Sequence, residues 1–434
     1  MKEKIIKEKA LLVDVIFPNE KSRNSNYEFR ELFNLATTAG AEVCGEITQK
    51  RIKPDAAFFV GKGKSKIIVN QAHELNCNII LFNEELSPTH VKNLQKLAGK
   101  KIKIIDRTGI ILYIFSRNAK TKESKKQVEL AQLEYMLPRL TRQWTHLERQ
   151  MGGIGTRGGP GETQIEIDRR LIRKQISKLK KHLEKISRVR YTQNEGRKNA
   201  YKIALVGYTN AGKSTLLKAL TGENVYIKDQ LFATLDTTTR RLDLSKELPV
   251  LISDTVGFIH NLPHNLVASF RSTLSEVNEA DLILKVVDCS SSYFKTHLNT
   301  ISDVMKNITS RKIDYILVFN KMDRIDDSKI LNKLILKYPN AVFISAQKKL
   351  RIKKLMDEII SKATESNLEI SVKIPYERSA LLNVLYEEIH VISREEDIDG
   401  FNFRVSGKPE RIAKINSLLK NNSAKGGVSD TLKK

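Results

Sequence analysis

The stretch KIALVGYTNAGKSTLLKAL, residues 202–220, combines an apolar strand, a glycine-bearing loop and the start of an amphipathic helix. Its middle matches the phosphate-loop pattern G-x-x-x-x-G-K-[ST], in the strand–loop–helix context that the motif requires. Glycines leave room for a phosphate, and backbone N–H groups and the helix N-terminus then face it. Lys213 is predicted to contact the β- and γ-phosphates, and Ser214 to supply a hydroxyl to Mg²⁺. The loop residues are Gly207, Tyr208, Thr209, Asn210, Ala211, Gly212, Lys213 and Ser214.

The residues around this stretch repeat the same alternation of apolar and amphipathic segments. Apolar runs at 202–207, 249–254, 281–288, 314–320 and 341–345 predict buried parallel strands. Helical stretches separate these runs, so the sequence indicates a doubly wound α/β domain. Ligands of such domains bind beyond the carboxyl ends of the strands, and we therefore expect the chemistry of this chain at those ends.

The loop FATLD carries the next predicted element, about twenty residues after the phosphate loop. A loop threonine can complete a Mg²⁺ shell and sense the γ-phosphate. Thr234 is the candidate metal ligand, and Thr237, Thr238 and Thr239 are alternatives that their spacing does not exclude. The candidate nucleotide-site residues of this loop are Phe232, Ala233, Thr234, Leu235 and Asp236.

The sequence DTVG ends the strand at 249–254. Asp254 is predicted to hold Mg²⁺ through a water molecule, and Gly257 to offer its N–H to the γ-phosphate. Loss of that phosphate would release the loop, which is how such switches work. Lys213 and Gly257 are therefore the predicted stabilisers of the γ-phosphate. The candidate residues of this segment are Asp254, Thr255, Val256 and Gly257.

The sequences NKMD and SAQ end the last two predicted strands. The Asp323 carboxylate can accept two hydrogen bonds from the Watson–Crick edge of guanine, whereas adenine presents no such pair of donors. The N–H of Ala346 is predicted to meet the guanine oxygen. GTP is therefore the predicted substrate, rather than ATP. The candidate residues are Asn320, Lys321, Met322, Asp323, Ser345, Ala346 and Gln347.

Two details concern the rate of hydrolysis. Phe258 follows DTVG where many GTPases carry a glutamine that orients water, and an apolar side chain cannot polarise water. We therefore expect slow hydrolysis that a partner accelerates, and the sequence does not identify the residue that orients the attacking water. Asn210 is either an ordinary polar residue of the loop or a ligand of a potassium ion beside the phosphates.

Composition points to the kind of partner. The 434 residues include 75 Lys and Arg against 50 Asp and Glu, a net charge of +25. Such an excess favours a polyanion, with nucleic acid as the first candidate and an anionic membrane surface as the second. A generally basic proteome is the alternative explanation, and the excess of lysine over arginine fits it.

Several features concern the compartment. The N-terminal MKEKIIKEKA lacks the apolar core of a signal peptide, and no apolar run approaches the length of a membrane span. We therefore expect a cytoplasmic protein, monomeric and without stable membrane insertion, that is able to associate with a membrane surface. Cys44, Cys77 and Cys289 have no metal-ligand spacing and are expected to be buried free thiols.

Composition and patterning divide the chain into four predicted domains. Residues 1–118 form an N-terminal α/β domain and residues 119–197 a helical hairpin linker. Residues 198–365 form the doubly wound GTPase domain, and residues 366–434 a small C-terminal α/β domain with a disordered tail at 421–434. Apolar runs at the two ends suggest the strands of the flanking domains. Those of the N-terminal domain are 11–17, 41–47, 56–61, 78–83 and 102–106, and those of the C-terminal domain are 371–376, 388–393 and 401–406.

The hairpin is predicted from two apolar stripes with helical spacing. They are separated by the glycine-rich MGGIGTRGGPG, residues 151–161, which cannot continue a helix. Pro138 should kink or split the first helix. The stripes are Leu130, Leu133, Leu137, Leu140, Trp144 and Leu147, then Ile165, Ile172, Ile176, Leu179, Leu183 and Ile186. A basic series on the second helix is either a solvated face or an RNA-contacting one. Its members are Arg169, Arg170, Arg173, Lys174, Lys178, Lys180 and Lys181.

The segment GGIGTRGGPGETQIEIDRR, Gly152–Arg170, together with GYTNAGKS, FATLD and DTVGFI, resembles the HflX family of translational GTPases over essentially the whole chain. The resemblance implies binding to ribosomes, chiefly the large subunit and its RNA, and splitting of stalled or idle ribosomes into subunits. It also implies ATP binding or hydrolysis by the N-terminal domain, as in several members. Thr237 stands where the family usually has proline.

Two alternatives to ribosome splitting stay open at this point. One is a GTPase checkpoint of large-subunit assembly, and the other is an RNA-binding scaffold or RNA-remodelling ATPase that acts through the N-terminal domain. Gly61, Gly63 and Lys64, in FFVGKGK, form either an anion-binding turn for RNA or ATP or an ordinary connection between elements.

Overall fold

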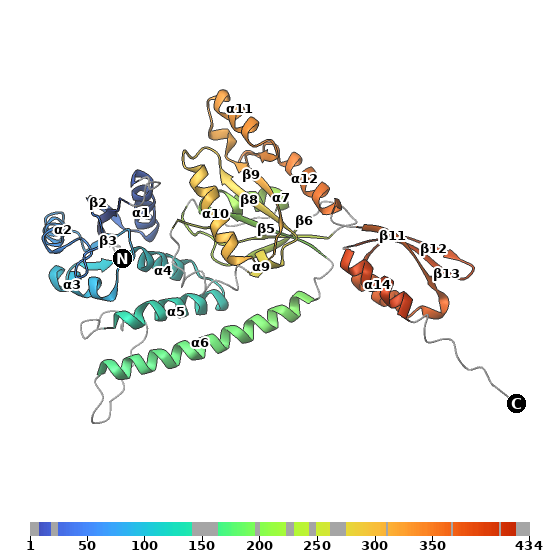
Figure 1. The fold of residues 1–434 in the computed structure, drawn as a ribbon, viewed down its shortest axis with the longest axis horizontal. Coiled ribbons are helices and arrows are strands. Elements are labelled where there is room, and N and C mark those ends of the chain that lie inside the picture. The colour runs from blue at the N-terminus through green and yellow to red at the C-terminus, as the bar shows by residue number, and fades with distance from the viewer. Residues whose placement is uncertain are drawn as a thin grey trace, which may run out of the picture.

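The computed structural model describes residues 8–18, 25–140, 164–195, 200–222, 230–242, 249–260, 275–309, 311–365, 368–407 and 409–421. Figure 1 shows the sheets of this described part spread along the long axis of the molecule, with the largest sheet in the middle. The glycine-rich segment at 151–161, the predicted stripe positions Trp144 and Leu147, and the tail after Asn421 lie outside the described residues. The predicted α/β fold class is confirmed by the sheets and helices that follow.

The N-terminal sheet is parallel, in the order β2-β1-β3-β4. Its strands are β1 (Lys9–Ile16), β2 (Glu42–Lys50), β3 (Ile79–Phe82) and β4 (Lys103–Ile105), and its helices are α1 (Ser25–Ala39), α2 (Lys62–Glu74), α3 (Pro88–Ala98) and α4 (Arg107–Asn118). Alternate residues of β1 serve opposite faces. Leu12 packs in the cluster with α1 and α4, whereas Leu11 and Val13 pack in the cluster with α2 and α3. Because both faces are covered, the strand reads as a continuous apolar run.

One apolar run of this domain, residues 56–61, is not a strand. The Asp55 side chain accepts hydrogen bonds from the N–H groups of Ala57 (3.0 Å) and Phe58 (2.9 Å), and Phe59 has the left-handed φ of 66°. These local bonds fold the run into a turn, since an aspartate that bonds to its own following backbone competes with strand pairing.

The glycines after that turn begin a helix. Gly61 has φ +84° and precedes α2, and Gly63 and Lys64 lie in the first turn of this helix. A Cβ on Gly61 would lie 2.7 Å from the guanidinium of Arg51, which itself donates to the Val60 carbonyl (2.8 Å). The structure therefore places Gly61, Gly63 and Lys64 at the start of α2, with the Arg51 side chain beside Gly61.

The helical hairpin joins the N-terminal domain to the central one. It comprises α5 (Lys122–Met136), a single 3₁₀ turn at Leu137–Arg139 and α6 (Gln164–Glu195). Pro138 lies in the 3₁₀ turn, so the first helix ends at the predicted break. Leu130 and Leu133 of α5 pack against Leu179 of α6, with Ile172, Ile176 and Leu183 beside them. The two helices lie side by side below the N-terminal sheet in Figure 1.

The central sheet has the order β10-β9-β8-β5-β7-β6, and all neighbours are parallel except the β6–β7 pair. All five predicted strands of this domain are present. The strands are β5 (Tyr201–Gly207), β6 (Thr238–Leu242), β7 (Val250–Asp254), β8 (Leu282–Asp288), β9 (Asp314–Asn320) and β10 (Ala341–Phe343). The helices are α7 (Lys213–Thr221), α9 (Ser275–Glu279), α10 (Phe294–Ile308), α11 (Ser328–Lys337) and α12 (Ile352–Glu365), with a 3₁₀ turn at Met322–Arg324.

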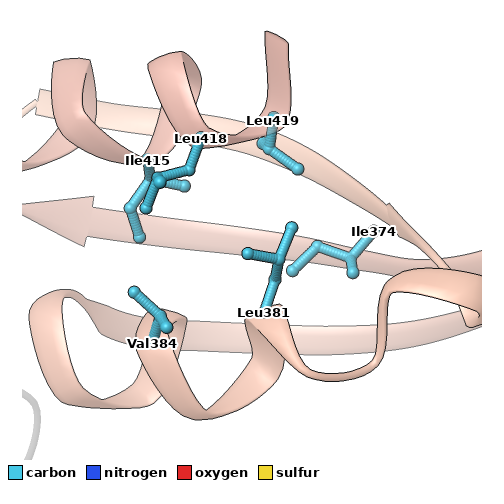
Figure 2. Close-up of a pocket in the computed structure, with 6 residues that line it drawn as sticks. All are labelled: Ile374, Leu381, Val384, Ile415, Leu418 and Leu419. Carbon is cyan, nitrogen blue, oxygen red and sulfur yellow. The ribbon is translucent and has the colours of Figure 1, made fainter. Parts of the chain in front are cut away.

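The C-terminal sheet is antiparallel, in the order β11-β13-β12. It comprises β11 (Leu368–Pro375), β12 (His390–Asp397) and β13 (Gly400–Gly407), covered by α13 (Leu381–Glu388) and α14 (Pro409–Asn421), with a 3₁₀ turn at Tyr376–Arg378. Figure 2 shows aliphatic side chains around a small gap between α13, α14 and β11. Because Ile374, Leu381, Val384, Ile415, Leu418 and Leu419 offer no polar group, this gap is part of the core rather than a ligand site.

The structure also bears on thiols and membranes. Cys77 and Cys289 are buried free thiols and Cys44 is partly buried. Burial raises the pKa of Cys77 to about 11 and that of Cys289 to about 12, so both thiols stay protonated at neutral pH. Among the described residues, no helix has the length and apolar character that a membrane span needs.

Candidate nucleotide-binding site

The phosphate loop needs its glycines for two different reasons. A Cβ on Gly207 would lie 2.3 Å from the carbonyl oxygen of Val286 in the neighbouring strand β8. Gly212 has φ +90°, and a Cβ there would lie 2.3 Å from the side-chain amide of Asn320. The first glycine lets the loop leave the sheet, and the second allows the left-handed turn into α7.

Lys213 curls back over this loop. Its Nζ donates to the carbonyl groups of Gly207 (3.3 Å) and Tyr208 (3.0 Å), and the residue is only 6% exposed. Burial lowers the pKa of Lys213 to about 8, against a smaller opposing effect of the Asp254 carboxylate. A buried ammonium group with carbonyl partners alone is incompletely neutralised, and an anion in the loop would complete its neutralisation.

Three side-chain oxygens converge beside this lysine. Ser214 Oγ lies 2.8 Å from Thr234 Oγ1 and donates to Asp254 Oδ2 at 2.5 Å. Burial raises the pKa of Asp254, although Lys213 and the hydrogen bonds of Ser214 and Thr234 oppose that rise. Asp254 Oδ1 is buried with no hydrogen-bond partner in the described part of the chain. Two hydroxyls and a buried carboxylate are a donor set that suits a hard divalent cation.

This convergence bears on which threonine of the loop region lies at the site. Thr238 and Thr239 belong to β6 and pair with Asp254 and Ser253 of β7. The Thr239 hydroxyl bonds to Ser253 Oγ (2.8 Å). The geometry therefore favours Thr234 over these two alternatives.

The end of DTVG is held against the phosphate loop by backbone hydrogen bonds of the next residue, Phe258. Phe258 N–H donates to the Gly207 carbonyl (3.0 Å), and Thr209 N–H donates to the Phe258 carbonyl (2.7 Å). A Cβ on Gly257 would lie 2.9 Å from Thr209 Cα and 3.0 Å from Lys213 Nζ, so a side chain there would crowd the loop. The Phe258 side chain is 1% exposed and packs in the core with Val206. It therefore contributes no group that could orient water.

The NKMD and SAQ segments meet through Asn320. Its side-chain amide donates to the Ala211 carbonyl (2.9 Å), and its Oδ1 accepts the N–H of Ala346 (2.9 Å). The Ala346 N–H that was predicted to meet guanine is thus bonded to Asn320 in this structure. Lys321 lies against the loop as well, because its Nζ donates to the Asn210 carbonyl (2.7 Å) and pairs with Asp288 (2.8 Å). Asn320 and Lys321 therefore brace the phosphate loop.

Asp323, whose carboxylate is predicted to bind guanine, follows Asn320 and Lys321 along the chain. Asp323 lies just after β9, in the 3₁₀ turn Met322–Arg324, and its side chain is 10% exposed. The ammonium group of Lys348, in the segment after SAQ, is 3.9 Å from it. The two segments that were predicted to form the base end of the site are thus neighbours in space.

The structure does not bring every residue of FATLD to the phosphate loop. The Phe232 ring packs edge-on against Phe115 of α4, with ring centroids 4.7 Å apart, and its carbonyl accepts from the Asn118 side chain (2.8 Å). Leu235 is 1% exposed in the main hydrophobic cluster. Of the five predicted side chains, Thr234 is the one that contacts the metal-ligand set.

Asp236 lies at the N-terminus of α5 instead. Its carboxylate accepts from Thr121 Oγ1 (2.6 Å) and from the N–H groups of Lys120 (2.9 Å) and Thr121 (3.4 Å). Burial alone would raise the pKa of Asp236, but the bonds from Thr121 and Ser124 and from the backbone lower it below its ordinary value. The Asp236 side chain, predicted from the sequence to belong to the nucleotide site, therefore faces the helical region in this structure.

A second contact with the N-terminal domain was not anticipated from the sequence. The hydroxyl of Tyr208, inside the phosphate loop, donates to Glu31 of α1 and accepts from Tyr27 (2.8 Å) and from the N–H of His260 (2.7 Å). The imidazole of His297 stacks on the Tyr208 ring, with centroids 4.1 Å apart. Burial raises the pKa of Tyr208 well above its ordinary value, so the hydroxyl stays protonated.

Arg107 completes that contact. It pairs with Glu31 through one amino group, which also donates to the His260 carbonyl (2.9 Å). Both charged side chains are 6% exposed. Glu31, Arg107 and Tyr208 thus tie the N-terminal domain both to the phosphate loop and to the chain just after DTVGFI.

Taken together, a phosphate loop between β5 and α7, a converging hydroxyl–carboxylate set and the NKMD segment beyond β9 define a P-loop GTPase. Three family models match successive parts of the chain. They are described as GTP-binding GTPase N-terminal (residues 26–116), GTP-binding GTPase Middle Region (118–197) and 50S ribosome-binding GTPase (202–321).

Curated relatives identify the family. GTPase HflX of Caldanaerobacter subterraneus is 40% identical over 96% of this chain and 94% of its own. GTPase HflX of Escherichia coli is 39% identical over 89% of this chain and 90% of its own. GTPase HflX of Alkalihalophilus pseudofirmus is 49% identical over 71% and 73%. The chain belongs to the HflX family of GTPases, binds guanine nucleotides and hydrolyses GTP.

Proposed function

We propose that this GTPase binds the ribosome in its GTP form, chiefly through the large subunit, and separates stalled or idle ribosomes into subunits. The observation that supports the proposal is a basic helix, α6, that is followed a few residues later by β5, the strand that leads into the phosphate loop. GTP hydrolysis then resets the protein for release. The protein is expected to act in the cytoplasm as a monomer.

The geometry of the loop supports the roles that we propose for its residues. Lys213 and the Gly257 N–H would stabilise the γ-phosphate, and Asp323 would select guanine. Ser214 and Thr234 would hold Mg²⁺ directly and Asp254 through water, since their oxygens already converge. Bound Mg²⁺ would supply charge neutralisation to the phosphates. Asn210 remains a candidate ligand for K⁺.

Hydrolysis by the isolated protein is expected to be slow. The residue after DTVG is the core residue Phe258, which cannot polarise water. A partner would have to supply or position the group that orients the attacking water. Turnover measured on the isolated protein, with and without ribosomes, tests this expectation, and fast turnover alone would contradict it.

The exposed side of α6 supports contact with RNA. Arg170, Arg173, Lys174, Lys178, Lys180 and Lys181 are exposed. The apolar side of the helix is packed against α5, and Lys180 pairs with Glu134 of α5 (2.8 Å), whereas Arg173, Lys174 and Lys178 have exposed side chains. Each phosphate neutralised by such a side chain makes binding weaken as salt rises.

Gradient sedimentation of purified intact ribosomes tests the proposal. Incubation with the protein and a non-hydrolysable GTP analogue is expected to convert 70S-type particles into subunits. Binding to immature large-subunit particles alone would instead support an assembly checkpoint. Splitting or RNA unwinding that needs ATP and persists in Asp323→Ala would support the ATPase alternative.

A matched pair of variants tests the contribution of the basic helix. Lys174→Glu with Lys178→Glu reverses two exposed charges one turn apart on α6. Lys329→Glu with Lys333→Glu makes the same change on α11 of the GTPase domain. The α6 pair is expected to weaken ribosome binding and flatten its salt dependence. Equal effects of the two pairs would show that general charge, rather than α6, drives binding.

A further inference from the structure

The FATLD loop contacts two separate parts of the molecule. Thr234 lies against Ser214 and the metal-ligand set of the phosphate loop. Phe232 and Asp236, two residues to either side, lie against the corner between α4 and α5. Within one short loop, therefore, the residue that would sense the γ-phosphate alternates with residues that hold the helical region.

The Asp236 carboxylate lies at the N-terminus of α5. Thr121 is the N-cap of α5 and accepts the N–H of Ser124 (3.1 Å). The carboxylate accepts from the Thr121 hydroxyl and from two backbone N–H groups that precede the helix. A negative charge at a helix N-terminus is favoured by the unpaired N–H groups and the helix dipole.

The helix that Asp236 contacts is firmly attached on its other sides. Tyr135, near the end of α5, donates to the buried Asp106 (2.7 Å), and Arg139 pairs with the same carboxylate (3.2 Å). Leu130 and Leu133 pack on α6. A displacement of the start of α5 would therefore be passed to the N-terminal sheet and to the hairpin.

We propose that Asp236, with Phe232, is a latch that couples the nucleotide state of the phosphate loop to α5, and through α5 to the hairpin. Thr234 and Asp236 are separated by one residue and lie within about 7 Å of each other along the chain, so a shift of the loop at Thr234 is readily passed to Asp236. Leu235 is buried between them and leaves little slack. The Thr234 and Asp236 contacts form together when the γ-phosphate is present, and they are lost together when it leaves.

The coupling has a reciprocal consequence. Docking of α5 on the FATLD loop changes the affinity for the nucleotide by some factor. The nucleotide must then change the equilibrium for docking of α5 by the same factor. Couplings of this kind are typically about fivefold or more. Asp236 is thus a positioning residue, because it acts on the nucleotide through Thr234 and touches no phosphate itself.

Amide hydrogen exchange of the full chain tests the latch. The peptide covering residues 119–125, which carries the Lys120 and Thr121 amides, is followed with GDP and with a non-hydrolysable GTP analogue, each with Mg²⁺. Wild-type protein is expected to show slower exchange there with the analogue than with GDP. Asp236→Asn keeps the shape but removes the charge, and it is expected to exchange quickly with both nucleotides.

The control variant is Asp327→Asn. Asp327 caps α11, where its carboxylate accepts the Lys329 N–H (2.8 Å), so it matches Asp236 in chemistry and lies in the GTPase domain. It is expected to leave the nucleotide dependence at 119–125 unchanged. The proposal also predicts that Asp236→Asn lowers the preference for the analogue over GDP by about fivefold or more, measured by titration.

Two results would overturn the latch. One is wild-type protein that binds the analogue but exchanges equally with both nucleotides at 119–125. The other is Asp236→Asn that retains the full wild-type difference. The latch rests on the nucleotide site proposed above, and the titration separates the two: a chain that fails to bind the analogue refutes that site, whereas binding without a change in exchange refutes the latch.

Discussion

The GTPase domain meets the rest of the chain at two places that differ in burial. At the first, Tyr208 meets the paired Glu31 and Arg107, whose side chains are each 6% exposed. At the second, Asp236 meets Thr121 in a contact that is open to solvent. The first place holds the phosphate loop and the second holds FATLD.

The difference matches what each segment has to do. A buried ion pair with hydrogen-bonded neighbours has one good geometry and a high cost for any other. It suits a loop that must keep its shape through every nucleotide state. A half-buried carboxylate whose hydrogen bonds lie at the surface can exchange its partners for water at a lower cost than a buried ion pair. It suits a segment that moves with the γ-phosphate, and four measurements can break or sharpen this contrast.

Removing the buried cation should have the largest effect. Arg107→Leu leaves the Glu31 carboxylate buried without its partner, and losing one member of such a pair costs about 3–5 kcal/mol. Urea-induced unfolding measures this as a fall in the free energy of unfolding. Arg394→Leu, which removes an exposed pair with Glu396 (2.7 Å), is the control and should cost at most about 1 kcal/mol. Similar losses in the two variants would remove the basis of the contrast.

The second-largest effect is expected from acid, which should lower the free energy of unfolding through His297, the residue that stacks on Tyr208. Burial lowers the pKa of His297 from 6.5 to about 4, while nearby Glu31 acts in the opposite direction. Below pH 6.5 the unfolded chain takes up a proton at His297 that the folded protein does not bind until about pH 4. The free energy of unfolding therefore falls across this window, by about 3 kcal/mol in total, and is unaffected above it.

The variant His297→Phe isolates that effect, because it retains a ring against Tyr208 but cannot be protonated. The difference in unfolding free energy between wild type and variant is measured by urea titration at intervals from pH 7 to pH 4. As the pH falls, we expect the free energy of unfolding of the wild type to decrease relative to that of His297→Phe. A constant difference would show that His297 does not titrate in this range.

A smaller loss of free energy of unfolding is expected from a substitution in the phosphate loop itself. Tyr208→Phe removes a hydroxyl that donates to Glu31 and accepts the His260 N–H, and leaving buried partners unsatisfied costs about 1–3 kcal/mol. GDP and the GTP analogue should lose affinity by similar factors, because the loop serves both. A selective loss for the analogue would instead make Tyr208 part of the switch.

The smallest effect on the free energy of unfolding is expected at the half-buried Asp236, whose hydrogen bonds lie at the surface. Asp236→Asn should change the free energy of unfolding by less than about 1 kcal/mol, since its bonds are replaced by bonds to water. Thermal unfolding of the nucleotide-free protein measures this change. A loss as large as that of Arg107→Leu would mean that Asp236 holds the fold rather than a moving segment.

Local patterns in the sequence were sufficient to predict five strands of the central sheet. The five apolar runs became strands because their composition suits burial on both faces. The run at 56–61 failed, since the turn bonds of Asp55 override its apolar composition. Which threonine reaches Ser214 depended on the pairing of β6 with β7, and pairing register is not written in the spacing of one loop.

The contacts between domains could not have been predicted from such patterns. Glu31 and Tyr208 are 177 positions apart, and neither lies in a motif that refers to the other. The contact of Asp236 could not be predicted either. Its place in FATLD suggested that it binds the nucleotide, whereas its partner Thr121 lies 115 positions away. Motifs report what one segment binds, and they say little about side chains in the same segment that face another domain.

The length of α6 gives the latch a mechanical meaning. Its 32 residues, at 1.5 Å each, make a rod of about 48 Å that ends just before the first strand of the central sheet. A tilt of about 5° at that end would carry the opposite end through about 4 Å, more than the length of a hydrogen bond. A displacement too small to expose any core residue near the phosphate loop would thus be amplified into a movement of several ångströms at the N-terminal end of α6.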